Sequence, residues 1–265
     1  MFKNATPLKA EEHRDFKVFE SNDYSYAKGE LMAPIVFSEM ADIAREYPII
    51  FPTNNSQLPY ALMGLEPNQN AYVRDDGQWM GTYIPAHIRR YPFALSPMPA
   101  SEGQKQGDVR FAIMVDLDAP HLKNPNGHPV FTAQGELTPH MQERVKLLEG
   151  MQKALDTTKH LVKTLEDSGL LVERVIKIQR RGQEPYQMKG LRVIDEKQLN
   201  QMEGDAFLAL RDKGVLPLIY SHLLSWANFR QGPIAGKYPE LAAKPGTKNP
   251  AFQYESDLID FSNLS

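Results

Sequence analysis

The sequence contains no cysteine among its 265 residues. Disulfide bonds, thiolate nucleophiles and cysteine-ligated metals are therefore excluded for this chain. It also lacks an apolar run of about 18 residues, the length that a membrane-spanning helix requires. We therefore expect no insertion into a membrane, whereas the absence of cysteine is compatible with either redox compartment.

An excess of positive charge is missing as well. Thirty lysines and arginines against 33 aspartates and glutamates give a net charge of −3, so nucleic acid is not an expected partner. The N-terminus has no continuous apolar stretch of the kind found in signal peptides, which predicts a cytoplasmic location.

Familiar catalytic motifs are absent too. The chain has no P-loop, no glycine-rich dinucleotide turn and no Gly-x-Ser-x-Gly elbow. These absences favour a protein with no catalytic residues and no cofactor, and leave an enzyme of another kind open.

The composition is that of a globular protein, with 42% hydrophobic and 24% charged residues. Apolar residues at helical spacing predict helices over 37–47, 138–169 and 215–230. Apolar runs predict strands at 49–51, 60–65, 71–74 and 110–117, and a hairpin from 172–179 and 186–194. The predicted fold is α+β, with a mixed, largely antiparallel sheet in the N-terminal half and a helix-rich C-terminal half that contains one long helix.

The most information-dense stretch runs from Thr82 to Leu95 and contains two prolines, two adjacent arginines and three aromatic rings. Pro85 suits the first turn of a helix, where its missing N–H has no helical partner. Pro92 disfavours the α conformation in the residue before it, so the helix should end there. We expect a short helix that fixes Arg89 and Arg90 among aromatic side chains.

Two interpretations of these arginines stay open. A guanidinium between aromatic rings can be a structural clamp on an internal carboxylate such as Glu39. It can also bind an anionic small molecule such as a carboxylate, a phosphate or an acidic sugar. The candidate ligand-binding residues are Trp79, Tyr83, His87, Arg89, Arg90 and Tyr91.

A second candidate site follows the predicted strand 110–117. Asp116, Asp118, His121 and His128 are residue types that bind divalent metals. Their spacing matches no familiar zinc or calcium signature, and a polar loop, with Asp118 capping a turn, is the favoured interpretation. If they bind a metal, the chain could be a metal-dependent hydrolase or oxygenase.

Several segments resemble the SapC-like family of bacterial proteins, in addition to the arginine stretch. They are Ala-Pro-Ile at 33–35, Glu-Met-Ala at 39–41, Tyr-Pro-Ile-Ile-Phe at 47–51, Leu-Ile-Tyr-Ser-His-Leu-Leu-Ser at 218–225 and Asn-Phe at 228–229. The resemblance covers about residues 1 to 230 and implies a single globular domain, in which we expect two lobes at about 1–136 and 137–230. The SapC-like family is distinct from the peptide-transporter permease that shares the SapC label.

The missing catalytic motifs and the possible docking tail favour a non-catalytic binding or accessory protein of this family. Members of this family are described as surface-layer related and tend to be encoded near outer-membrane uptake receptors, so an uptake or surface-associated system is the expected context. A structural component of the surface layer is the alternative from this resemblance.

The last part of the chain differs in character. Glycine and proline recur over residues 231–250, which predicts a linker. Residues 251–265 combine acidic and apolar side chains. Such a tail can bind a protein partner, dock on its own domain or remain disordered.

Overall fold

The computed structural model describes residues 1–54, 56–99, 109–180 and 183–239, and for residues 177–180 and 183–185 it describes the backbone alone. The helices are α1 (Ala10–His13), α2 (Met40–Glu46), α3 (Ala86–Arg89), α4 (Pro139–Asp167), α5 (Glu196–Asn200), α6 (Gly204–Asp212), α7 (Leu216–Ser225) and α8 (Gly232–Lys237). Short 3-10 helices are η1 (Ser25–Ala27), η2 (Phe37–Glu39), η3 (Pro120–Leu122) and η4 (Trp226–Phe229).

The strands form three antiparallel sheets. They are β1 (Ala5–Pro7), β2 (Lys17–Val18), β3 (Met32–Pro34), β4 (Ile49–Pro52), β5 (Tyr60–Leu62), β6 (Phe93–Pro97), β7 (Phe111–Asp116), β8 (His128–Pro129), β9 (Leu171–Arg180) and β10 (Gln183–Ile194). The strand orders are β3-β5-β4-β10-β9, β1-β7-β6 and β2-β8. The predicted α+β fold with antiparallel strands is confirmed, and the predicted hairpin, now β9 and β10, extends the sheet formed by β3, β5 and β4.

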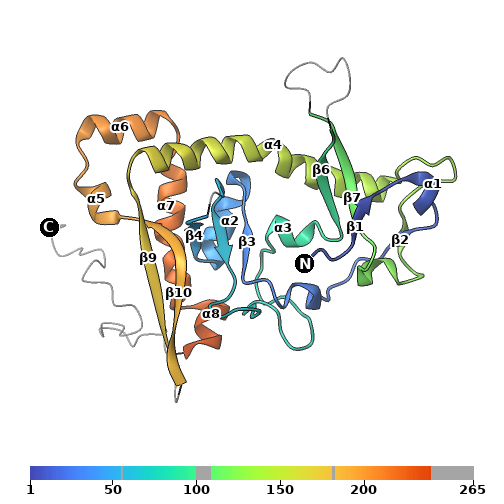
Figure 1. Cartoon of the computed structure of the whole chain (residues 1–265), viewed down its shortest axis with the longest axis horizontal. Helices are drawn as coiled ribbons and strands as arrows, with labels where there is room; N and C mark the ends of the chain where they lie inside the picture. The colour runs from blue at the N-terminus through green and yellow to red at the C-terminus, as the bar shows by residue number, and fades with distance from the viewer. Residues whose placement is uncertain (55, 100–108, 181–182, 240–265) are drawn as a thin grey trace.

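The predicted long helix is α4, and its ends follow from the sequence. The Thr138 hydroxyl accepts a hydrogen bond from the Met141 N–H, and Pro139 occupies the first turn. Gly169 follows the helix with a φ of +75°, a conformation that glycine adopts without strain. Figure 1 shows α4 running along the three-stranded sheet at one end and beside the five-stranded sheet at the other.

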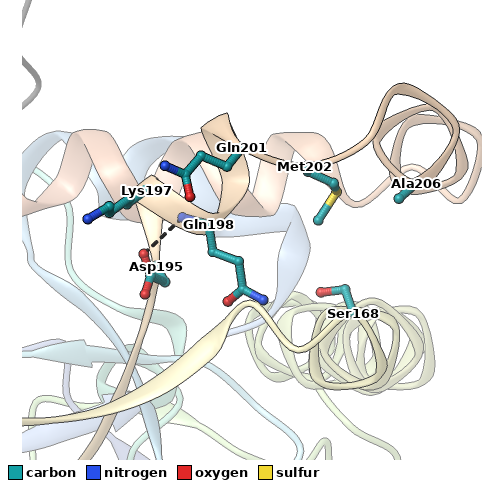
Figure 2. A pocket seen from close by; sticks show the side chains of 7 residues that line it. All are labelled: Ser168, Asp195, Lys197, Gln198, Gln201, Met202 and Ala206. Atoms are coloured by element: carbon teal, nitrogen blue, oxygen red, sulfur yellow. Dashed lines mark hydrogen bonds between the residues drawn. The ribbon is translucent and has the colours of Figure 1, made fainter.

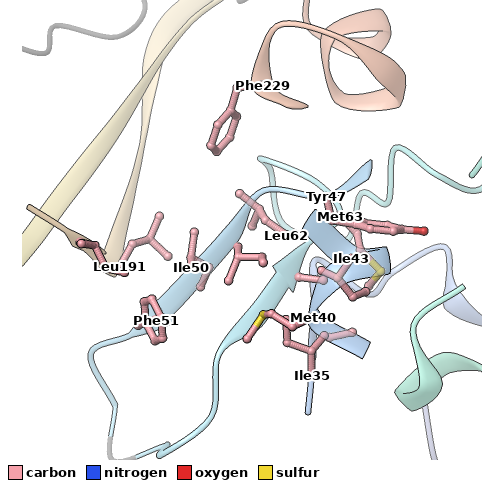
Figure 3. Packing of buried hydrophobic residues seen from close by; sticks show 14 of the residues in the cluster. Ile35, Met40, Ile43, Tyr47, Ile50, Phe51, Leu62, Met63, Leu191 and Phe229 are labelled. Atoms are coloured by element: carbon pink, nitrogen blue, oxygen red, sulfur yellow. The ribbon is translucent and has the colours of Figure 1, made fainter. Parts of the chain in front are cut away.

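The larger hydrophobic core lies between the five-stranded sheet and the helices α2, α4 and α7. Figure 3 shows Phe51 of β4 and Leu191 of β10 on one side, and Met40 and Ile43 of α2 on the other. Phe229 of η4 packs into the same cluster. This arrangement follows from the predicted helix over 37–47, whose apolar face becomes η2 and α2.

A smaller core lies between the three-stranded sheet and the first half of α4. Its buried members among the described residues are Val18, Phe93, Val115, Val130, Phe131, Met141 and Leu148. Leu161, Val162 and Leu165, further along α4, belong to the larger core instead. One helix thus serves two cores, and each core draws residues from both sides of position 136.

Two local predictions were wrong. Residues 71–74 form no strand, since only an isolated bridge joins Val73 to Trp79. Residues 232–237 of the predicted linker form α8, and Ile234 and Tyr238 are buried in the larger core. Pro233 lies in the first turn of α8, a position where proline starts a helix. Residues 240–250 of the predicted linker and the tail 251–265 lie outside the described residues.

Candidate functional site

The arginine stretch folds around a short helix, as predicted, but Pro85 is the N-cap of this helix and does not lie in its first turn. Pro85 precedes α3 with extended dihedral angles, φ −51° and ψ 136°, and the Tyr91–Pro92 peptide bond is cis. Ile88 of α3 is buried in the larger core, whereas Phe93, where β6 begins, is buried in the smaller core. The residues between them therefore lie at the junction of the two cores.

Arg89 is exposed, but its guanidinium is held in place. Its Nε donates to the Ile84 carbonyl at 2.8 Å, and its Nη2 donates to the Tyr83 hydroxyl at 3.0 Å. Its central carbon lies 5.1 Å from the centre of the Tyr83 ring, within the range of a cation–π contact. Two neutral oxygens and one aromatic face thus orient a charged group toward solvent.

The Tyr83 hydroxyl connects this arginine to a buried carboxylate. It donates to Glu39 Oε2 at 3.0 Å, and the Ala86 N–H donates to the same oxygen at 2.9 Å. The Val36 N–H donates to Glu39 Oε1 at 3.1 Å. Burial raises the pKa of Tyr83 to about 12, so the hydroxyl keeps the proton that it donates.

Glu39 is only 4% exposed. Burial raises the pKa of this carboxyl above its ordinary value, although the N–H groups of Ala86 and Val36 and the Tyr83 hydroxyl act in the opposite direction. Glu39 therefore holds the first residue of α3 in place, because it accepts the Ala86 N–H. It reaches Arg89 through Tyr83 and not by a direct ion pair, so the clamp that we considered is indirect.

Arg90 has a different environment. It is half-buried, its central carbon lies 5.5 Å from the centre of the Phe2 ring, and its Nε is buried without a hydrogen-bond partner in the described part of the chain. Burial lowers the pKa of this guanidinium. Burial, followed by the charges of Arg90 and of the N-terminal amine, lowers the pKa of His87 to about 3. His87 is thus neutral at physiological pH.

Tyr91 is the centre of an aromatic cluster at the same junction. Its ring stacks on Tyr26 with centroids 4.5 Å apart, and it meets Phe2 and His121 edge-on at 5.3 Å each. Its hydroxyl donates to Asp116 Oδ2 at 3.0 Å. Tyr91 is 4% exposed, so it packs the junction and does not present a polar group to solvent.

Trp79 lies on the side of the larger core. Its Nε1 donates to the Tyr47 hydroxyl at 2.9 Å, and that hydroxyl donates to the Tyr83 carbonyl. Its ring also contacts the rings of Tyr24 and Tyr72. Trp79 therefore supports Tyr83 through Tyr47.

Sequence reasoning missed Tyr26 and Tyr47 as members of this network. Tyr47 was assigned to an apolar helix face, and Tyr26 belongs to a polar stretch without a recognisable pattern.

The four metal candidates do not gather into a site. Asp116 is fully buried and accepts hydrogen bonds from the N–H groups of Lys3 and Asn4 at 3.0 and 2.9 Å, besides the Tyr91 hydroxyl. Burial alone would raise the pKa of Asp116, but these donors together with the Asp118 N–H bring it below its ordinary value. The buried carboxylate therefore has a structural environment that satisfies its charge.

The two histidines of that candidate set lie in separate places. His121 is 6% exposed and lies against Tyr26 and Tyr91, and burial together with the Arg144 charge lowers its pKa to about 4. His128 is exposed and stacks on His140 with centroids 4.3 Å apart. Within the described ranges, no three histidine or carboxylate side chains are placed to hold a metal ion.

A shallow depression lies elsewhere, at the C-terminal end of α4 beside α5 and α6 (Figure 2). Its volume is about 570 Å³, and its lining residues are Ser168, Asp195, Lys197, Gln198, Gln201, Met202 and Ala206. The Asp195 carboxylate already caps α5, because it accepts the Gln198 N–H at 3.0 Å. None of the predicted ligand-binding residues lines this depression.

Comparison with known proteins identifies the family. None of the helices in the described part of the chain is long and apolar enough to cross a membrane. No curated protein and no solved structure matches the sequence. The family model SapC matches residues 8–231, which is most of the chain and includes the whole arginine stretch. The chain belongs to the SapC family.

Proposed function

We propose that this SapC-family protein is a non-catalytic binding or accessory protein, and that its α3 surface at Arg89 binds an anionic group. The ligand class is a carboxylate, a phosphate or an acidic sugar. The observation that carries the proposal is the state of Arg89: it is exposed, yet Ile84 and Tyr83 fix its orientation.

The charge of Arg89 is available for a ligand. A guanidinium has five N–H donors, and the contacts to Ile84 and Tyr83 use two of them. Both acceptors are neutral, and no carboxylate of the described residues forms an ion pair with Arg89. A side chain that is already oriented loses less conformational entropy when it binds a planar anion. A surface arginine without such contacts loses more side-chain conformational entropy when it binds an anion.

The test is a binding measurement with a panel of anions. Calorimetry with phosphate, a dicarboxylate and glucuronate should give saturable binding by at least one of them, and Arg89→Gln should weaken it by about 10-fold or more, the range for a lost charged hydrogen bond. Tyr83→Phe keeps the ring beneath the guanidinium and should weaken binding less. Arg45→Gln is the matched control, because Arg45 is exposed and pairs with Asp42 at 3.3 Å.

Two outcomes contradict the proposal. One is an absence of saturable binding for every anion in the panel. The other is an Arg89→Gln variant that binds as well as the wild-type protein. Elemental analysis of the purified protein separates the alternative of a metal-dependent enzyme, since a stoichiometric metal would support that class instead.

The proposal includes a protein partner and a location. The acidic and apolar tail 251–265, which lies outside the described residues, is the segment proposed to bind a partner protein. Recovery of partners by the full chain and by a chain that ends at residue 250 tests this, and equal recovery removes the role of the tail. We place the protein in the cytoplasm, and cell fractionation distinguishes this from a structural role in the surface layer.

A further inference from the structure

Basic side chains from two elements meet at the start of α4. β8 lies beside α4, and β2 pairs with β8 and lies beside η3. Directly after β2, the Phe19 N–H donates to the His121 carbonyl of η3 at 2.9 Å. The next residue is Glu20, and its carboxylate reaches His140 in the first turn of α4 and Arg144 one turn later. Segments far apart in the sequence thus bring these side chains together.

The contact of Glu20 with α4 is loose. Glu20 Oε1 lies 3.7 Å from His140 Nε2 and 3.7 Å from Arg144 Nη2, and both distances exceed that of a hydrogen bond. Positions 140 and 144 are four apart, so the two side chains lie on one face of the helix. The Glu20 side chain is 67% exposed, whereas that of Arg144 is only 18% exposed. Two nitrogens therefore converge on one position for an anionic oxygen, which a movable carboxylate approaches without a hydrogen bond.

Nitrogen atoms of this cluster are buried without hydrogen bonds. His121 Nδ1, His140 Nε2 and Arg144 Nε have no hydrogen-bond partner among the residues that the structure describes. His121 is 6% exposed. Burial is the main cause of the lowered pKa of each histidine, and the Arg144 charge adds to it in both, so the guanidinium lies close to the two rings. Buried polar groups in native proteins have partners with few exceptions, so this cluster indicates a place for a bound polar group.

We propose that Arg144, His140 and His121 bind a tetrahedral oxyanion, a phosphate or sulfate group, which displaces the Glu20 carboxylate. A guanidinium binds two oxygens of such a group at once, and a protonated imidazole donates to another. Donors that come from both α4 and η3 suit a group whose oxygens point in several directions. The site lies on different elements from Arg89 of α3 and does not depend on the anion site proposed there.

Binding should strengthen as the pH falls. Both histidines have lowered pKa values and are neutral at physiological pH. A dianion stabilises the protonated form of each imidazole, so the affinity should rise as His121 and His140 take up protons. The titratable side chains that act on or contact these two histidines are Glu20, Asp23, Tyr26, Tyr91, His128 and Arg144.

The test uses sulfate and the full chain. Sulfate stays a dianion throughout the range in which histidine titrates, so any dependence on pH comes from the protein. The NMR resonances of the His121 and His140 rings report this site, whereas sulfate bound at Arg89 leaves them unchanged. We expect saturable shifts of both rings, with tighter binding at about pH 5.5 than at about pH 8.

Four variants identify the groups involved. Arg144→Gln should weaken sulfate binding by about 10-fold or more, the range for a lost charged hydrogen bond. Glu20→Gln should tighten it, because the competing carboxylate is removed. Arg89→Gln should leave the ring shifts as they are in the wild type. Lys146→Gln is the control for lost positive charge, since Lys146 lies on α4 and pairs with Glu143 at 2.6 Å.

Each other result overturns the proposal. Ring resonances that sulfate does not shift at either pH show that solvent satisfies these nitrogens. Equal weakening by Arg144→Gln and Lys146→Gln shows a general effect of charge. If Glu20→Gln does not tighten binding, the anion does not take the place of this carboxylate. Circular dichroism of every variant verifies that the chain is folded, and Glu20→Gln changes only an exposed side chain.

Discussion

The two hydrophobic cores of this protein differ in size and in what holds them together. The larger one gathers 33 buried residues of the described chain on a five-stranded sheet, and the smaller one gathers seven on a three-stranded sheet. Of the helices and strands that the structure describes, only α4 contributes buried residues to both cores, through Met141 and Leu148 at one end and Val162 and Leu165 at the other. The small core therefore depends on a helix that the large core anchors.

The comparison also explains where the candidate site lies. α3 occupies the junction, and a different buried carboxylate supports each end of the arginine stretch. Glu39 accepts the Tyr83 hydroxyl and the Ala86 N–H on the side of the larger core. Asp116 accepts the Tyr91 hydroxyl on the side of the smaller core. Two buried carboxylates thus lie at the boundary between the two cores.

The largest expected difference between the cores comes from a phenylalanine in each. Phe51 and Phe93 are both fully buried, so replacing either with alanine should lower the free energy of unfolding by about 3–5 kcal/mol. The regional consequences should differ. Phe51→Ala should accelerate amide hydrogen exchange in both sheets, because the smaller core needs the larger one. Phe93→Ala should accelerate exchange mainly in β6 and β7.

Hydrogen exchange monitored by mass spectrometry measures both effects at peptide resolution. If the two variants accelerate exchange over the same peptides, the cores unfold as one unit and the proposed dependence is wrong. An unchanged exchange rate in β4 and β10 of Phe51→Ala would contradict it from the other direction.

A smaller effect is expected at the carboxylate beneath α3. Glu39→Ala leaves the Ala86 and Val36 N–H groups and the Tyr83 hydroxyl without their acceptor. The expected loss is about 2–3 kcal/mol, since buried donors without a partner are costly. Urea denaturation measures it, and Glu11→Ala, at an exposed position on α1, is the control. A loss below that of the control would mean that solvent or a rearranged α3 replaces this acceptor.

Much of the fold could be predicted because the signals are local. The cap at Thr138, the proline at 139 and the glycine at 169 fix the ends of α4 within the helix itself. β7 was predicted from its apolar run, and it is the central strand of its sheet. By contrast, β1 and β2 have three and two residues, so they exist only because β7 and β8 pair with them. No pattern within such short segments indicates a strand.

The candidate site was predictable only in part. The two prolines around α3 correctly predicted a short helix, and Glu39 was named as a possible internal carboxylate. The sequence could not show that Tyr83 stands between Glu39 and Arg89, since the tyrosine and the glutamate are 44 residues apart. It also could not show that Asp116 binds the N–H groups of Lys3 and Asn4, which lie more than 100 positions away. Contacts of this range follow from the packing of the two cores.

The finest distinction between the two sides of the junction is the response of their carboxylates to pH. The pKa of Asp116 is lowered, so its contribution to stability is present above its unfolded value and is lost as the pH falls through its folded value. The pKa of Glu39 is raised by burial, so its contribution to stability is present below its unfolded pKa and is lost as the pH rises through its folded pKa.

Substituting each carboxyl by its amide removes the titration of that group and nearly preserves the shape of the side chain. Asp116→Asn should therefore flatten the loss of stability in acid, whereas Glu39→Gln should flatten a loss toward neutral pH. Urea denaturation between about pH 3 and pH 7 measures both slopes relative to the wild type. If both variants change the slope of the free energy of unfolding against pH in the same direction, the pKa values of Asp116 and Glu39 are not shifted in opposite directions, and this prediction is wrong.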